Sequence, residues 1–207
     1  MSNFLFRLIS EDRLQDRLNP WLRSIYANLR LYNLPMTQQS IKRATEADAA
    51  LLAELGARTF ADSFGGQNTP EDMAAYLAQW FGTEIQRAEL ADPLNTFLII
   101  ENDGVAIGYA HLRAGEPPGC VTGSKAIELS RLYVSSTFQG GGVGARLMEA
   151  CLNEARQAGY QTMWLGVWKQ NVRAQAFYQR WNFSVVGEHV FQLGADRQMD
   201  WLMERPL

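Results

Sequence analysis

The spacing of hydrophobic residues predicts two helices in the first half of the chain. The first begins at Thr45, which can cap it, while Asp48 lies in the first turn, where the helix dipole favours an anion. The second has Thr69 as its expected N-cap and Pro70 as its first helical residue. Their apolar stripes are Leu51, Leu52, Leu55 and Phe60 in the first helix, and Met73, Tyr76, Leu77 and Trp80 in the second.

Seven other segments have the pattern of β-strands. Residues 163–168 (MWLGVW) are apolar on both faces, which predicts a central strand covered on both sides. Residues 102–104 (NDG) predict a tight turn between two strands, because these residue types accept a positive φ. The seven predicted strands are 41–44, 96–101, 105–112, 127–134, 163–168, 187–193 and 198–203.

Two further helices are predicted between the later strands. Within 143–158 apolar residues repeat every four positions, and Gly159 is a natural C-terminal cap. Asn171 is expected to cap a last helix that runs to Trp181. The order of these elements predicts one mixed sheet in an α/β fold.

Residues 1–35 have a different character. Apolar residues three to six positions apart suggest one or two amphipathic helices broken at Pro20, but charged residues interrupt them before a signal-peptide core forms. No stretch reaches the roughly 18 uninterrupted apolar residues of a membrane span. We therefore expect an N-terminal extension over 1–35, helical or poorly ordered, followed by one domain over 36–207. The extension is either specific to the lineage or an artefact of upstream translation.

The amino-acid composition and net charge of the chain exclude some classes of function. The 207 residues are 47% hydrophobic and 20% charged, which suits one globular domain with a sizeable core. A net charge of −3 argues against nucleic acid as a partner and fits a cationic small substrate better. Cys120 and Cys151, the two cysteines, lie in no CxxC or Cys/His cluster, so neither a disulfide framework nor a metal site is expected. A reducing cytoplasm is the predicted location.

Four glycines directly precede the third predicted helix, in the stretch FQGGGVGARLMEA from Phe138 to Ala150. A Walker A motif is excluded, because Ala145 and Arg146 follow the last glycine where that motif needs Lys and then Ser or Thr. The dinucleotide pattern GxGxxG/A matches, but the acidic residue expected about 20 positions later is missing from the stretch WLGVWKQ.

A third pattern, (Gln/Arg)-x-x-Gly-x-(Gly/Ala), is met by Gln139, Gly142 and Gly144. Glycines expose backbone N–H groups at a helix N-terminus, where the helix dipole adds about half a positive charge. A pyrophosphate can bind there without a lysine. The same glycines would also suit a flexible loop in front of an ordinary helix cap.

With this third motif the sequence resembles the GNAT superfamily of acetyl-CoA-dependent N-acyltransferases. The resemblance extends from about Met36 to the C-terminus and includes ELSRLYV before the loop and NVRAQAFYQRWNF after the next strand. The stretches TFADSFGGQNTPEDMAAYL and WLGVWKQNVRAQAFY look like bacterial spermidine/spermine N-acetyltransferases of the PaiA type. Asn182 departs from the family, which usually has Gly there, but Asn tolerates the left-handed conformation. The resemblance implies a twisted, mostly antiparallel sheet of about seven strands flanked by about four helices.

The resemblance also implies where acetyl-CoA binds. A bulge in the strand 127–134 would separate it from 163–168 and leave a cleft, along which Leu132, Tyr133 and Val134 offer backbone groups to the pantetheine arm. Gly142 and Gly144 are expected to be the demanding positions of the phosphate loop, and Gly140 and Gly141, which the motif leaves open, the permissive ones. The complete set of expected cofactor-binding residues is Leu132, Tyr133, Val134, Gln139, Gly140, Gly141, Gly142, Val143, Gly144, Ala145, Asn171, Ala174, Phe177 and Tyr178.

Catalytic roles follow from the same resemblance. Tyr178 is the expected general acid for the departing thiolate, in place of a purely packing role beside Phe177. A backbone N–H, that of Leu132, is expected to hold the thioester oxygen. Glu128 is the candidate base, although its place in the strand equally fits a solvent-facing residue. His111 and His189 are alternative bases, but a lone His is more often structural.

The acceptor side is expected to lie along the first two helices. Asp62, Asp72, Tyr76 and Trp80 are the candidate substrate-binding residues, with Glu71 and Glu84 nearby, although solvated helix surface explains the same charges. The predicted reaction is direct acetyl transfer in a ternary complex to a primary amine, most specifically a polyamine such as spermidine or spermine. The alternatives are another amine (an amino acid, an antibiotic amine or a peptide N-terminus) and a CoA-binding regulatory module without catalysis. The exposed sheet edges leave a homodimer open.

Overall fold

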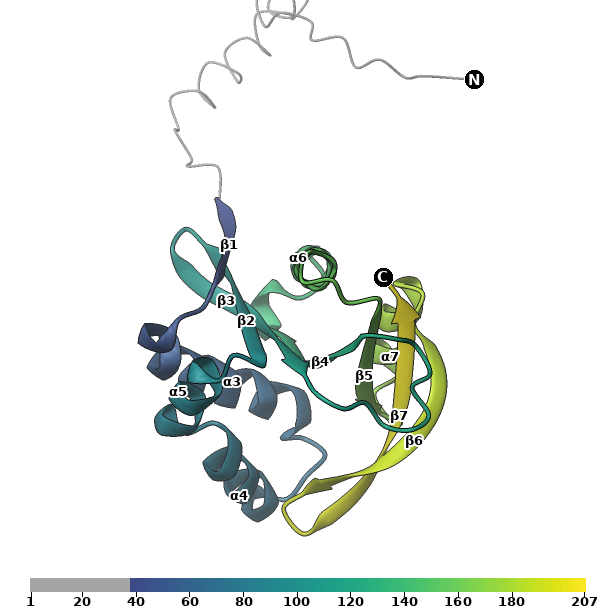
Figure 1. The fold of residues 1–207 in the computed structure, drawn as a ribbon. Coiled ribbons are helices and arrows are strands. Elements are labelled where there is room, and N and C mark those ends of the chain that lie inside the picture. The colour runs from purple at the N-terminus through teal and green to yellow at the C-terminus, as the bar shows by residue number, and fades with distance from the viewer. Residues whose placement is uncertain (1–37) are drawn as a thin grey trace, which may run out of the picture. The chain divides into compact units, whose positions relative to one another are not determined.

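The computed structural model describes residues 38–207, and the helices expected before Pro35 lie outside this part of the chain. Residues 38–207 form one sheet with helices on both faces (Figure 1). The strands are β1 (Gln39–Arg43), β2 (Asn95–Asn102), β3 (Val105–Ala114), β4 (Ala126–Val134), β5 (Thr162–Trp168), β6 (Ser184–Leu193) and β7 (Asp196–Pro206). The α-helices are α3 (Ala49–Phe64), α4 (Pro70–Trp80), α5 (Thr83–Ala91), α6 (Val143–Gln157) and α7 (Val172–Arg180).

The sheet has seven strands in the order β1-β2-β3-β4-β5-β7-β6. Strands β4 and β5 are parallel, whereas every other neighbouring pair is antiparallel. The helix α6 connects the two parallel strands, as a parallel pair requires a long crossover. The expected mixed, mostly antiparallel sheet is confirmed.

The predicted bulge lies in β4. His111 of β3 pairs with Arg131 and Leu112 pairs with Leu129, so Ser130 is an extra residue on β4. Pairing between β4 and β5 covers only 126–128 and 162–164. We call the unpaired parts of the two strands, 129–134 and 165–168, the β4–β5 fork.

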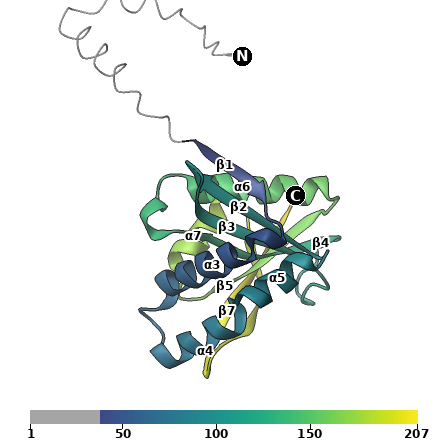
Figure 2. The same ribbon diagram turned by 90° about the vertical axis from the view of Figure 1, so that its left-hand side faces the viewer.

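Helices cover the two faces of the sheet separately. In Figure 2, α3 and α5 lie in front of β2 and β3, where Leu52 and Leu55 pack on Phe97, Ile99 and Tyr109. The opposite face carries α6, whose apolar residues fill the main core together with β2 to β5. The buried residues of α6 are Val143, Leu147, Met148, Cys151, Leu152 and Ala155, the stripe that its four-residue spacing predicts.

The sequence pattern predicted about four helices, and the structure has five α-helices among the described residues. The helix it missed is α5, whose buried residue is Gln86, a polar side chain. A helix that buries an amide instead of an apolar stripe gives no hydrophobic period to detect. Its polar contacts, described below, hold it in place instead.

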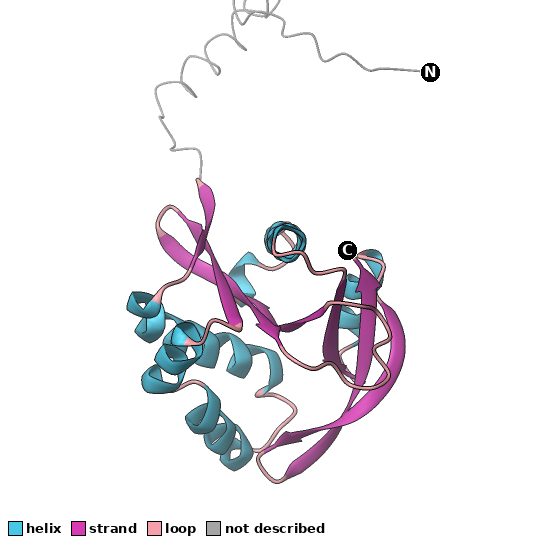
Figure 3. Cartoon of the chain, viewed as in Figure 1, coloured by secondary structure: helices cyan, strands magenta, loops and turns pink. Residues whose placement is uncertain are grey.

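Strands β6 and β7 form a long hairpin whose tip lies beside α4 (Figures 1 and 3). Asp72 of α4 accepts a 2.6 Å hydrogen bond from the N–H of Ala195 in the hairpin turn. The ring of Tyr76 lies 5.6 Å from that of Phe191. The helix and the hairpin therefore form one wall on the α3 side of the sheet. None of the helices in residues 38–207 is long and apolar enough to cross a membrane.

Candidate active site

The glycine loop ends at the N-terminus of α6. Gly140 and Gly142 have φ angles of 86° and 81°, and Gly142 is the N-cap of the helix. No side chain of the described residues caps α6, so its first N–H groups remain available to an anion. A Cβ at either glycine would meet nothing within 4 Å, which leaves the surface of the loop open. This geometry fits a bound pyrophosphate.

The division of the glycines differs from the sequence expectation. Gly140 was expected to be permissive, but its left-handed φ is as demanding as that of Gly142. Gly144 lies within α6, where a Cβ would be 3.8 Å from the ring of Phe177 and 4.0 Å from Val134. Gly144 thus lies where the loop, the end of β4 and α7 meet. At Gly140 and Gly142, the positive φ angle is the reason for a glycine.

Gln139 connects the same three elements. Its Nε2 donates to the carbonyl oxygen of Val134 at 3.0 Å, and its Oε1 accepts from Arg173 of α7 at 2.8 Å. Sequence reasoning did not select Arg173, an exposed cation that this contact holds beside the glycine loop. Its place two residues after the helix cap Asn171 was the available signal.

The start of α7 is tied to the end of β5. Asn171 Oδ1 accepts a 3.0 Å hydrogen bond from the N–H of Ala174, which confirms the predicted cap. Gln175 donates to the carbonyl oxygens of Trp168 and Lys169 at 3.1 and 2.8 Å. These contacts fix the angle at which α7 leaves the β4–β5 fork. They show Asn171 as the helix cap and Ala174 as the residue whose N–H it accepts from, and the contact of either residue with a cofactor stays a prediction.

Tyr178 lies in the last turn of α7, half-buried against the core under α6. Its ring packs 5.4 Å from Phe177 and 5.8 Å from Phe183. Burial raises the pKa of Tyr178 above its ordinary value, and nearby Cys151 adds to the increase. The phenol therefore keeps its proton at neutral pH, as a proton donor must.

Strand β4 presents backbone groups to the fork. Leu132, Tyr133 and Val134 pair on one side with Ala110, Tyr109 and Gly108 of β3, and lack a partner strand on the other. In an antiparallel pair, alternate residues direct their N–H and C=O groups away from the partner. An extended ligand in the fork can thus add hydrogen bonds to this edge of β4.

Glu128 is engaged in an ion pair at the base of the fork. Its Oε2 accepts from Arg113 Nε at 2.8 Å and lies 2.7 Å from the NH2 of the same side chain. The Glu128 side chain is 14% exposed, beside the exposed side chain of Arg113. Both contacts end on Oε2, which leaves Oε1 available for chemistry.

The two histidines have different surroundings. His111 is buried, stacks on Phe97 at 4.0 Å and shares a 2.9 Å hydrogen bond with Asn95. Burial lowers its pKa to about 2, with smaller effects from Arg131 and Arg113, so it is a neutral structural residue. His189 of β6 instead lies 3.7 Å from Asp200 of β7, on the wall of the fork.

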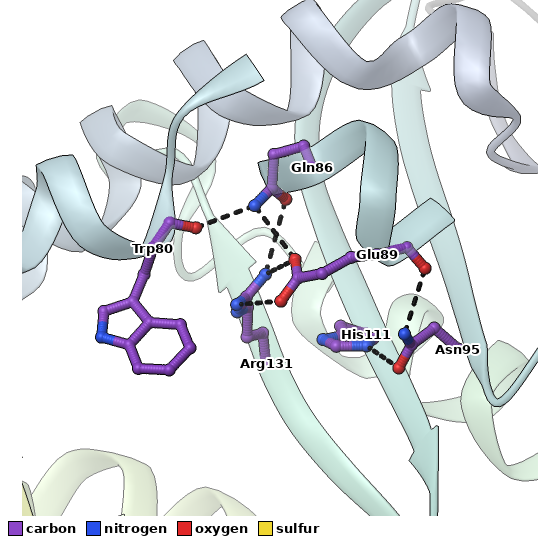
Figure 4. A network of polar contacts seen from close by, with 6 residues as sticks. All are labelled: Trp80, Gln86, Glu89, Asn95, His111 and Arg131. Atoms are coloured by element: carbon purple, nitrogen blue, oxygen red, sulfur yellow. Dashed lines mark hydrogen bonds and ion pairs between the residues drawn. The ribbon is translucent and has the colours of Figure 1, made fainter. Parts of the chain in front are cut away.

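A buried polar network joins α5 to the bulged strand (Figure 4). Arg131, directly after the extra residue Ser130, makes two hydrogen bonds with the Glu89 carboxylate, of 2.7 and 2.8 Å. Gln86 donates to Glu89 at 3.0 Å and to the carbonyl oxygen of Trp80 at 2.8 Å. Figure 4 shows Trp80 at one end of this network. The network therefore fixes the end of α4 relative to the fork.

The predicted acceptor residues do not form one cluster. Asp62 accepts a 3.0 Å hydrogen bond from Ser136, beside the glycine loop. Both oxygens of Asp72 are already bonded, to Ala195 and to Thr69. Tyr76 and Trp80 are neighbours, with ring centroids 6.2 Å apart.

Trp80 also lines an open pocket of about 510 Å³ on the outer side of α5. Its other lining residues are Glu84, Ile85, Ala88, Glu89, Asp92 and Asn95. Glu84 forms an ion pair with Arg87. Residues 38–207 contain no group of three or more His, Cys, Asp or Glu side chains that could hold a metal ion.

Comparison with known proteins agrees with this geometry. The model of the acetyltransferase (GNAT) family matches residues 57–183. An uncharacterised N-acetyltransferase of Lactobacillus delbrueckii subsp. lactis is 34% identical over 172 residues, covering 83% of this chain and 99% of the relative. The N-alpha-acetyltransferase RimI of Mycobacterium tuberculosis is 30% identical over 149 residues, covering 72% of this chain and 80% of that protein.

Among solved structures, the PaiA N-acetyltransferase of Thermoplasma acidophilum in complex with coenzyme A superposes with a TM-score of 0.68 at 19% identity. The match covers 82% of this chain and 99% of that one, which confirms the fold. The family model matches more than half of the chain, and the Lactobacillus relative is aligned over nearly its whole length. These two matches establish the family of this chain. The chain belongs to the acetyltransferase (GNAT) family and is an acetyl-CoA-dependent N-acetyltransferase.

Proposed function

We propose that the enzyme acetylates a small primary amine that arrives as a cation, most specifically a polyamine such as spermidine or spermine. The observation that carries this proposal is the composition of the wall on the α3 side of the fork. This side has the carboxylate of Asp62 beside the glycine loop and, apart from it, the neighbouring rings of Tyr76 and Trp80. Carboxylates and aromatic faces are the groups that bind alkylammonium ions in water.

Acetyl-CoA binds, in this proposal, across the glycine loop and along the fork. The N–H groups at the start of α6 receive the pyrophosphate, and Arg173 adds a positive charge beside them. The free edge of β4 at 132–134 pairs with the amides of the pantetheine arm. This places the thioester near the bulge, where the strand changes the direction of its backbone groups.

The reaction then forms one C–N bond and breaks one C–S bond. The N–H of Leu132 holds the carbonyl oxygen while negative charge develops on it. The acceptor nitrogen first loses one proton to solvent and so attacks as a neutral amine. As the C–N bond forms, Glu128 takes a second proton from this nitrogen through Oε1, directly or through one water molecule. Tyr178 gives its proton to the departing sulfur, and later exchange with solvent returns both groups to their initial states.

A thiol-release assay over a panel of acceptors tests this function. Turnover with spermidine or spermine, at a kcat/KM higher than for amino acids and antibiotic amines, is the expected result. Turnover with another amine only would keep the reaction and change the acceptor. Tight binding of CoA with no turnover on any acceptor would instead point to a regulatory module.

A peptide N-terminus is the second candidate acceptor. It is favoured by the relative named N-alpha-acetyltransferase RimI, at 30% identity. The two candidates differ in charge, because a polyamine carries further ammonium groups and a peptide carries amides. A short peptide with a free N-terminus therefore belongs in the same panel, and its preference over spermidine would favour this second function.

A further inference from the structure

A buried carboxylate with one unpaired oxygen lies on the strand two places from β4. Asp200 of β7 is 8% exposed and pairs with Trp168 of β5 on one side and His189 of β6 on the other. Its Oδ1 is buried and accepts no hydrogen bond from any group in residues 38–207. A buried oxygen of this kind costs free energy unless a water molecule, an ion or a ligand completes its hydrogen bonding, so it calls for an explanation.

Gly166 of β5, which has no side chain, leaves room for this carboxylate. A Cβ on Gly166 would lie 3.2 Å from His189 Nε2 and 3.4 Å from Asp200 Oδ2. Both side chains therefore lie over the backbone of β5, within the segment 165–168 that borders the fork. A glycine at this position, in a strand otherwise filled with large apolar residues, keeps that space for polar groups.

The groups around Asp200 come from several elements. Asp200 raises the pKa of His189, and Glu128 across the fork adds a smaller contribution. Tyr76 of α4 belongs to the same surroundings: burial raises its pKa to about 12, Arg131 opposes this increase, and the Asp200 charge adds to it. The charges of two carboxylates, Asp200 and Glu128, thus act on the imidazole of His189, and the charge of Asp200 acts on the phenol of Tyr76.

We propose that Asp200 Oδ1 binds the ammonium group of the acceptor amine at the β4–β5 fork, with His189 as a positioning residue for the carboxylate. The ammonium group donates a hydrogen bond to Oδ1, while His189 lies against Oδ2. The site rests on the proposed function, because it requires a cationic acceptor. It differs from the sequence expectation, which placed the binding carboxylates on the first two helices.

The test compares Asp200→Asn with Asp196→Asn, a matched change at an exposed carboxylate on the same strand. Steady-state kinetics with the best acceptor of the panel give separate KM values for amine and acetyl-CoA. Asp200→Asn should raise the amine KM about tenfold or more, because the hydrogen bond to the ammonium group loses the charge of its acceptor, with the acetyl-CoA KM little changed. Asp196→Asn should change neither. An unchanged amine KM in folded Asp200→Asn would overturn the site.

Gly166→Ala is the second variant, because it adds a methyl group beside Asp200 Oδ2 and removes no polar group. It should lower amine affinity and leave CoA affinity intact, whether or not Asp200→Asn folds. Calorimetric titration of spermidine into the protein with CoA bound separates this site from the proposed function. Spermidine binding that is equal in wild type and both variants overturns the site. Absence of spermidine binding in the wild type would contradict the polyamine as acceptor. Failure of the wild type to bind CoA would instead contradict the proposed function as a whole.

Discussion

Arg173 of α7 donates a 2.8 Å hydrogen bond to Gln139, the first residue of the glycine motif. A cation from one helix is thereby held at the N-terminus of another. The pair joins two sequence segments that lie on either side of β5, and it places a full positive charge next to the partial charge of a helix dipole.

Replacing Arg173 by Ala should raise the KM for acetyl-CoA and leave the amine KM unchanged, because one phosphate contact and the fixed position of Gln139 are lost. The rise should shrink as salt increases, since ionic strength screens an exposed charge. Arg58→Ala, an exposed arginine on α3, is the control. Equal effects of the two changes would show that only net charge matters.

The glycine loop offers a matched series of single changes. Gly140→Ala and Gly142→Ala should each weaken CoA binding, because an L-residue in the left-handed region costs about 1–2 kcal/mol. Gly141→Ala should change CoA affinity only slightly. The φ angle of Gly141 is not positive, and the atom nearest to an added Cβ would be the Phe138 oxygen, at 3.8 Å. Isothermal titration with CoA gives the three affinities. Equal losses at all three positions would contradict this division.

Tyr178→Phe removes one hydroxyl and keeps the packing of the ring against Phe177 and Phe183. We expect kcat to fall by about 10²-fold or more, the usual contribution of a general acid, with little change in the acetyl-CoA KM. Phe177→Leu serves as a packing control that retains the phenol. Unchanged turnover in Tyr178→Phe would leave that residue a packing role only.

Asp72→Asn should lower stability and not amine affinity. The pKa of Asp72 is lowered by hydrogen bonds from Ala195 and Thr69, so its folded value is below its unfolded value. Its contribution to stability is therefore present above the unfolded pKa and is lost as pH falls through the folded pKa. Urea unfolding at pH 7 and at about pH 3 should show a difference from wild type that shrinks in acid. A change in amine KM at constant stability would restore Asp72 as a substrate-binding residue.

The strands and the start of α4 could be predicted from local chemistry, whereas Thr45, expected to cap the first helix, caps a short 3₁₀ turn (Glu46–Asp48) and α3 begins at Ala49. Thr69 and Pro70 begin α4 as expected, and Asn182 adopts the predicted left-handed conformation with φ of 64°. Such signals need only a few neighbouring residues, because a cap or a turn acts on its own segment. The β4 bulge was predicted through the family resemblance alone.

The features that could not be predicted from the sequence depend on contacts between residues far apart in the chain. Helix α5 buries Gln86 in a polar network whose other members come from α4, β2, β3 and β4. Asp200 gains its surroundings from three other strands and α4, and nothing in the stretch DRQMDWLMERP marks it. The conformation of Gly140 was also missed, since the family motif leaves that position open. Only the assembled sheet brings these groups together.

The ion pair of Arg131 with Glu89 also has a consequence for how β4 finds its place. A slip of β4 by one residue would eliminate the bulge and turn Arg131 toward the opposite face, into the apolar layer beneath α6. A guanidinium there would be buried without a carboxylate, which is strongly unfavourable. The ion pair therefore favours the bulged register of β4 over the regular pairing with β3, because the regular pairing would separate Arg131 from Glu89.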